Sequence, residues 1–245
     1  WWGAKEFAEF SNGFIELPFA SMIIGAVSTV LLPAFSKAVI NENGNQEIIR
    51  LWNTSFIKSA KIIYPLAIYS CFFAEPIMLF LYGNKYSSSA PYFQIIAAIN
   101  LMRIIQYGPV LLALGKTGFY AYNQVISAII CITLSFVYVQ FFNNPLGIAC
   151  IFVISFFVTV ILQLNILKKT LDVKYVQLIP WKTLLILLIG AILSSMISLY
   201  SITIITINSI FLYLLFSFII FSVVYMIYCR LANIPYTEML QGIKQ

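Results

Sequence analysis

Three ionisable side chains lie within otherwise apolar stretches of the sequence: Glu16, Glu75 and Arg103. If such stretches cross a membrane, each ionisable residue costs about 2.5–3.5 kcal/mol on insertion scales, so each is a candidate functional group. Arg103 is the deepest of them, in the middle of the apolar stretch 92–114, and a guanidinium is well suited to binding phosphate. We therefore expect Arg103 to contact an anion or a sugar phosphate in a central cavity. The alternative is a structural arginine paired with carbonyl groups or with a carboxylate.

Uncharged polar residues accompany Arg103 along the same stretch. If the stretch is one helix with 100° per residue, its Arg103 face also contains Tyr92, Asn100, Gln106 and Tyr107. This face should meet protein or a water-filled cavity, because lipid cannot form hydrogen bonds with it. Asn100, Gln106 and Tyr107 therefore join Arg103 as candidate substrate-binding residues.

A second polar seam is expected in the stretch 119–142. Its members follow helical spacing along one side and are Tyr120, Gln124, Ser127, Cys131, Ser135 and Tyr138. Uncharged hydroxyls and amides suit the hydroxyls of a sugar, and they equally suit plain hydrogen bonds between helices. Gln124 is the candidate substrate contact of this seam.

The remaining charged candidates lie near the ends of the first and second apolar stretches, 12–36 and 60–82. Glu75 is either a coupling carboxylate, a carboxylate at the membrane interface, or a partner for Arg103 or Lys85. Lys58 and Lys61 lie three residues apart, where they can attract a phosphorylated substrate. The tendency of basic residues to gather on the cytoplasmic side explains these two lysines equally well. Glu16, at the start of the first stretch, is a candidate at the outer mouth of a cavity or a solvated interfacial residue.

The elements that must position these residues are membrane-spanning helices. Hydrophobic residues make up 62% of the chain and charged residues only 9%, whereas soluble domains have about 25% charged residues. The apolar runs are long enough, at about 1.5 Å per residue, to cross about 30 Å of hydrocarbon, and the strict alternation of membrane β-strands is absent. The sequence predicts an all-α, polytopic membrane protein whose seven spans are 12–36, 60–82, 92–114, 119–142, 145–167, 183–205 and 208–229.

Basic residues predict the orientation of these spans. If the spans alternate in direction, all but three of the 14 basic residues fall on one side: Lys37, Arg50, Lys58, Lys61, Lys116, Lys168, Lys169, Lys174, Lys182, Arg230 and Lys244. The positive-inside rule places that side, and the C-terminus, in the cytoplasm. Because the basic residues are distributed over separate loops and not clustered on one face, no nucleic-acid partner is expected.

Residue types also argue against catalysis and metal binding. The chain has no histidine and eight carboxylates, and its four cysteines lie far apart in predicted spans without a CxxC pair: Cys71, Cys131, Cys150 and Cys229. The residue types that bind metals or act as activated nucleophiles are therefore scarce in this sequence. We expect a protein that is not an enzyme and needs no cofactor. The opening WWGAKEF has no initiator methionine and no signal-peptide pattern, which suggests a chain cut from a longer one.

Four motifs in sequence order resemble the bacterial polysaccharide and lipid-linked oligosaccharide flippases. They are LPFASMIIGAVSTVLLPAFSK (17–37), YPLAIYSCFFAEPIMLFLYGNKYSSSAPYFQI (64–95), ALGKTGFYAYNQVISAI (113–129) and NNPLGIAC (143–150). The resemblance covers residues 5–170 and implies membership of the multidrug/oligosaccharidyl-lipid/polysaccharide exporter superfamily. Its members have 12 or 14 spans in two six-helix lobes around a central cavity.

By this resemblance the chain corresponds to the last seven of 14 spans. Residues 1–170 would form most of the C-terminal lobe, residues 171–245 would add two helices and a cytoplasmic tail, and the N-terminal lobe would be the missing partner. Flippases of lipid II resemble the chain less, because Gly13 stands where that branch has an arginine. Glu16 is the charged position of the family pattern that survives in the first span.

The resemblance implies a transporter that flips undecaprenyl-diphosphate-linked oligosaccharide repeat units across the bacterial cytoplasmic membrane by alternating access. Membrane lipids and a coupling ion, H⁺ or Na⁺, are further expected partners. We expect bends at Pro18, Pro33, Pro65 and Pro76 to allow the motion. The alternatives are a multidrug exporter, a lipid II flippase, or a membrane-bound polysaccharide polymerase or ligase, although the short predicted outer loops argue against the last.

Overall fold

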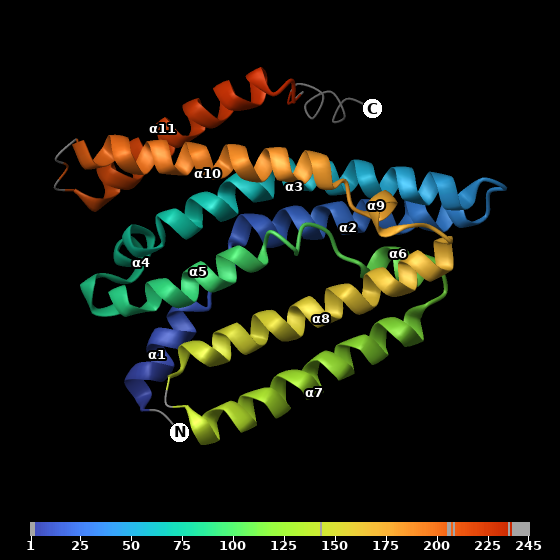
Figure 1. Cartoon of the computed structure of the whole chain (residues 1–245), viewed down its shortest axis with the longest axis horizontal. Helices are drawn as coiled ribbons and strands as arrows, with labels where there is room; N and C mark the ends of the chain where they lie inside the picture. The colour runs from blue at the N-terminus through green and yellow to red at the C-terminus, as the bar shows by residue number, and fades with distance from the viewer. Residues whose placement is uncertain (1–2, 143, 205–206, 208, 235, 237–245) are drawn as a thin grey trace.

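The computed structural model describes residues 3–142, 144–204, 207, 209–234 and 236 (Figure 1). Within this part of the chain the regular structure is entirely helical, which confirms the all-α membrane fold. The helices are α1 (Ala4–Gly13), α2 (Pro18–Val39), α3 (Gly44–Phe72), α4 (Ala74–Tyr82), the 3-10 helix η1 (Asn84–Ser89), α5 (Ala90–Ile99), α6 (Gly108–Ala113), α7 (Thr117–Phe141), α8 (Leu146–Leu171), α9 (Tyr175–Leu178), α10 (Trp181–Ile204) and α11 (Ile210–Leu231).

Five of these helices are long and apolar enough to cross a membrane. They are α2, α7, α8, α10 and α11, and they correspond to five of the seven predicted spans. Figure 1 shows the successive long segments running in alternate directions between the two ends of the molecule, as the predicted topology requires. Residues 205 and 208, where the sixth predicted span ends and the seventh begins, lie outside the described residues, as does Lys244.

The second predicted span is bent. Helix α3 begins at Gly44, within the region expected to be a partly helical loop, and continues for 29 residues. The chain then turns by 80° between α3 and α4, and the two helices together are long and apolar enough to form one broken span or a re-entrant loop. The bend is at Phe73, three residues before Pro76, which agrees with a bend at Pro76 because a proline disrupts the helix at the carbonyl four residues earlier, whereas the expectation needs correction at two other prolines. Pro65, like Pro33 of α2, lies inside a continuous helix.

The other two prolines lie at helix starts. Pro18 is the first residue of α2, a position where its missing N–H leaves no intrahelical hydrogen bond unmade. Pro76 lies in the first turn of α4, just after the 80° bend, and there too a proline is tolerated. These two prolines therefore mark where helices begin.

The third predicted span, 92–114, is broken into α5 and α6 with eight non-helical residues between them, which is a correction. The side-chain amide of Asn100 donates to the carbonyls of Ile96 and Ala97, at 3.1 and 3.4 Å, and so competes for acceptors at the end of α5. Pro109 cannot donate to the carbonyl of Ile105, and it lies in the first turn of α6, where a proline is tolerated because the helix begins there. The segment 100–107 therefore remains irregular, and the predicted helical face around Arg103 does not form.

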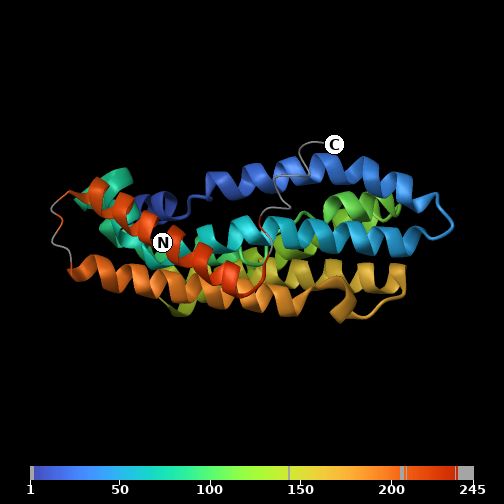
Figure 2. The ribbon, with the colours of Figure 1, turned by 90° about the horizontal axis from the view of Figure 1, so that it is seen from above.

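Helix α3 is the centre of the packing. It contacts α2, α5 and α10, and Figure 2 shows it lying between α2 and α10. Trp52 of α3 is buried, its indole N–H donates to the carbonyl of Leu178 at 2.9 Å, and its ring lies 5.3 Å from that of Tyr107. This contact ties the end of the irregular segment 100–107 to α3.

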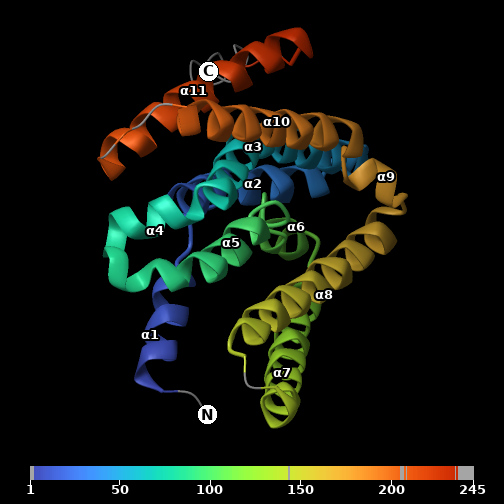
Figure 3. The ribbon, with the colours of Figure 1, turned by 60° about the vertical axis from the view of Figure 1, so that its left-hand side comes forward.

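Two helical hairpins flank this centre (Figure 3). The α10–α11 hairpin packs on α3, whereas the α7–α8 hairpin reaches the rest of the chain through α5, α6 and α9. The division of the chain at residue 170 into a lobe and two added helices stays a prediction. The space beside the α7–α8 hairpin leads to the candidate site.

Candidate functional site

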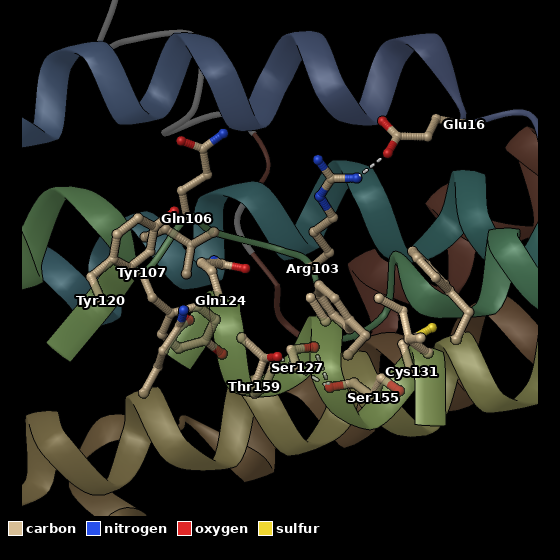
Figure 4. A pocket seen from close by; sticks show the side chains of 17 residues that line it. Glu16, Arg103, Gln106, Tyr107, Tyr120, Gln124, Ser127, Cys131, Ser155 and Thr159 are labelled. Carbon is tan, nitrogen blue, oxygen red and sulfur yellow. Dashed lines mark hydrogen bonds and ion pairs between the residues drawn. The ribbon is translucent and has the colours of Figure 1, made fainter. Parts of the chain in front are cut away.

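A cavity of about 660 Å³ lies between the α7–α8 hairpin, the irregular segment 100–107 and the residues just before α2 (Figure 4). Its polar lining consists of Glu16, Arg103, Gln106, Tyr107, Tyr120, Gln124, Ser127, Cys131, Ser155, Thr159 and Gln163. The apolar part of the wall includes Ile105, Ile132, Phe152 and Phe156. The cavity therefore brings together segments that are more than 140 residues apart in the sequence.

Arg103 forms an ion pair with Glu16 across the upper wall of this cavity in Figure 4. Glu16 lies on the short link between α1 and α2, and the Arg103 Nη1 atom donates to its Oε1 atom. The sequence named Glu75 as a possible partner for Arg103, but Glu75 is exposed on α4 and forms no ion pair with another described residue. The sequence candidates Arg103 and Glu16 thus form an ion pair, and Glu16 takes the role of Arg103 partner that was suggested for Glu75.

The pair is open to the cavity. The Arg103 side chain is 35% exposed and that of Glu16 is 51% exposed. A guanidinium has five N–H donors, and Arg103 makes one hydrogen bond to a side chain among the described residues. Its other donors are therefore available to an oxygen-rich or anionic ligand.

Three glutamines add uncharged donors and acceptors. Gln106 comes from the irregular segment, Gln124 from α7 and Gln163 from α8. None of the three side chains forms a hydrogen bond with another described residue, although Gln163 is only 3% exposed. An amide group offers both donors and acceptors, so these three side chains can bind hydroxyl groups of a ligand.

Gln163 is a site residue that the sequence analysis missed. It lies four residues after Thr159 and eight after Ser155, so all three fall on one face of α8. This spacing could have identified a second polar seam, opposite that of α7. In the structure the two seams lie side by side along one side of the cavity, where Ser127 contacts Ser155, and Arg103 and Glu16 lie on the other side (Figure 4).

The hydroxyl groups of the site are mostly occupied within the protein. Ser127 of α7 donates to the Ser155 carbonyl at 3.0 Å, Ser155 donates to the carbonyl of Ile151, and Thr159 donates to that of Ser155. Hydrogen bonding between helices, the alternative for the α7 seam, therefore accounts for Ser127. Tyr107 is buried against Trp52, and its ring forms part of the cavity wall.

The other sequence candidates lie away from this cavity. The Asn100 amide donates to the Ile96 carbonyl at the end of α5. The Tyr92 ring packs on Phe10 of α1, with 5.6 Å between the ring centroids. Lys58 is exposed on α3. Lys61 is buried and lines a different cavity of about 740 Å³ between α3 and α11. Ser135 and Tyr138 of the α7 seam do not line the 660 Å³ cavity.

Comparison with known proteins supports the sequence resemblance. Residues 7–91 match a family described as polysaccharide biosynthesis protein. The matched part runs from Phe7 within α1 to Pro91 at the start of α5 and includes Glu16, and it ends before Arg103 and the α7–α8 hairpin. No curated protein and no solved structure matches the chain. The family match supports the polysaccharide flippase family, and with the apolar helices it indicates a multi-pass membrane protein with a role in polysaccharide biosynthesis.

Proposed function

We propose that the protein moves lipid-linked oligosaccharide repeat units across the bacterial cytoplasmic membrane for the synthesis of surface polysaccharide. The observation that carries the proposal is the cavity with Arg103, Glu16 and three glutamines inside a polytopic membrane protein. Arginine inside such a protein is costly unless it meets a partner or water. A diphosphate-linked sugar needs both a cation and neutral hydrogen-bonding groups to replace its hydration, and the cavity offers both.

Arg103 would recognise the phosphate groups, and the glutamines would recognise sugar hydroxyls. In the absence of substrate Glu16 occupies one Arg103 donor. A diphosphate brings more negative charge than one carboxylate, so it would compete with Glu16 for the guanidinium. Exchange of one partner for the other would let Arg103 release the substrate without becoming an unpaired cation.

Alternating access would supply the movement. The cavity is bordered by an irregular segment, 100–107, and by the α7–α8 hairpin, which has few contacts with the other described helices. In transporters, irregular backbone at membrane depth lies where it is buried in protein or borders a water-filled cavity. The cavity would open toward the second lobe of a two-lobed transporter, and a gradient of H⁺ or Na⁺ would drive the cycle.

Substitutions that separate charge from pairing test the proposal. In the full-length protein we compare Glu16→Gln, Arg103→Gln and the double variant, and we measure surface polysaccharide at equal protein abundance. If Arg103 binds substrate, Arg103→Gln and the double variant lose most of the polysaccharide, while Glu16→Gln retains much more. Lys85→Gln, at an exposed lysine outside the cavity, is the matched control.

Two results would contradict this role of Arg103. Normal polysaccharide in Arg103→Gln would show that the guanidinium is dispensable. If the double variant makes more surface polysaccharide than Arg103→Gln alone, the pair has only a structural role. Removal of both charges would then preserve polysaccharide synthesis as well as the intact pair does.

A further inference from the structure

The last described residue, Tyr236, contacts α3 next to a proline. Its hydroxyl donates to the backbone carbonyl of Lys61 at 2.9 Å. In an α-helix that carbonyl accepts a hydrogen bond from the N–H four residues later, and here the fourth residue is Pro65, which has no N–H. Tyr236 thus donates to the carbonyl that Pro65 leaves without its helical partner.

Several further contacts hold the Tyr236 side chain in this position. The hydroxyls of Tyr236 and Tyr225 of α11 share a hydrogen bond of 3.1 Å, and the two rings pack edge to face at 6.3 Å. The Lys61 Nζ atom lies 5.6 Å from the centroid of the Tyr236 ring, within the range of a cation–π interaction. Burial raises the pKa of Tyr236, so its hydroxyl keeps its proton at neutral pH.

We propose that Tyr236 is a latch that closes the proline gap of α3 and so holds this helix in its continuous form. A proline inside a helix removes one hydrogen bond and favours a kink, yet α3 runs without a break from Gly44 to Phe72. The latch replaces the missing hydrogen bond from outside the helix. Its release would leave Pro65 free to act as a hinge.

The position of the latch connects the chain after α11 with the candidate site. The part of α3 before Pro65 carries Trp52, which packs against Tyr107 at the cavity wall. The part after Pro65 carries Tyr69, which bonds Ser217 of α11 at 2.8 Å. A bend at Pro65 would therefore move the α10–α11 hairpin relative to the cavity wall. This consequence for transport rests on the proposed function, whereas the latch itself does not.

Hydrogen exchange in the full-length protein tests the latch without any substrate. Tyr236→Phe removes the hydroxyl and keeps the ring. Loss of one hydrogen bond to a backbone carbonyl should speed amide exchange in residues 62–68 of α3 by about 2- to 10-fold. No change in the exchange of this segment would overturn the proposal.

Tyr228→Phe is the matched control. The Tyr228 hydroxyl of α11 also donates to a helix carbonyl, that of Ile186 in α10, at 3.1 Å. The Ile186 carbonyl can also accept the usual helical hydrogen bond, because Gly190, four residues later, has an N–H. We expect Tyr228→Phe to leave exchange in residues 62–68 unchanged. An equal effect of both substitutions there would show a general loosening of α11 and would overturn the latch.

Pro65→Ala supplies the rescue. Alanine at this position restores the N–H that bonds the Lys61 carbonyl, so the helix no longer needs Tyr236. In the Pro65→Ala background, Tyr236→Phe should change exchange of residues 62–68 by less than about 2-fold. The same increase in both backgrounds would show that Tyr236 acts elsewhere. Because no substrate is present, these outcomes are independent of whether the protein transports a glycolipid.

Discussion

Arg103 and Glu16 are partly exposed, and this exposure limits how much their ion pair stabilises the fold. A partly exposed ion pair contributes only about 0–1 kcal/mol to stability, and both side chains are more than a third exposed. Stability is therefore a weak reason for placing two charges here. Binding of a charged ligand is the stronger reason, because the cavity holds the pair beside uncharged hydrogen-bonding groups.

The buried amide of Gln163 yields a prediction at the residue scale. Gln163→Leu keeps the size of the side chain and removes its donor and acceptor at the cavity wall. Loss of one or two neutral hydrogen bonds to substrate, about 0.5–1.5 kcal/mol each, should lower surface polysaccharide several-fold at unchanged protein abundance.

Gln140→Leu is the control for this prediction, because Gln140 is exposed near the end of α7 and does not line the cavity. We expect it to leave polysaccharide at the level of the unchanged protein. A defect of equal size in both variants would argue against a substrate contact by Gln163.

The candidate residues could be predicted from the sequence better than their partners. Charge within apolar stretches was enough to single out Arg103 and Glu16, and helical spacing was enough to place Gln124 on a polar seam. The pairing of Arg103 with Glu16 spans 87 residues and depends on how the helices pack. A local pattern contains no information about such a contact, so Glu75 was an equally reasonable partner on sequence grounds.

At the scale of elements, hydropathy predicted where apolar segments lie and missed where helices break. The stretch 92–114 is apolar on average, but the side chain of Asn100 and the missing N–H of Pro109 affect single hydrogen bonds of the backbone. An averaged hydropathy does not register such local effects. The bend between α3 and α4 is local in the same way, because it comes at Phe73, three residues before Pro76.

The crossing of α10 and α11 gives a prediction at this scale. A Cβ atom added at Gly190 would lie 2.2 Å from the ring of Tyr228, so Gly190→Ala must displace the ring that bonds Ile186. Overpacking of this kind costs about 1–3 kcal/mol. Thermal unfolding of the purified protein should therefore have a lower midpoint.

Gly118→Ala is the matched substitution, because a Cβ atom there meets no atom within 4 Å. Its unfolding midpoint should be the same or higher, since alanine favours helix more than glycine does. Equal midpoints for the two variants would mean that the α10–α11 contact tolerates the extra methyl group.

At the scale of the whole molecule, alternating membrane crossings and their orientation are a prediction that labelling can test. Lys85 lies on η1 and Lys116 just before α7, at opposite ends of the segment that contains α5 and α6. With single cysteines at positions 85 and 116 in a cysteine-free protein, a membrane-impermeant reagent added to cells should label position 85 and spare position 116. Labelling of both positions from outside would overturn the alternating topology.

Transport of a lipid-linked repeat unit can be measured by the side of the membrane on which that unit accumulates. In cells that make the Arg103→Gln protein, we expect lipid-linked repeat units to be inaccessible to a glycosidase or lectin added from outside the cytoplasmic membrane, whereas the unchanged protein gives accessible ones. Accumulation of accessible repeat units in the variant would show that the protein does not transport them, because the defect would then lie in a polymerase or ligase step that follows transport.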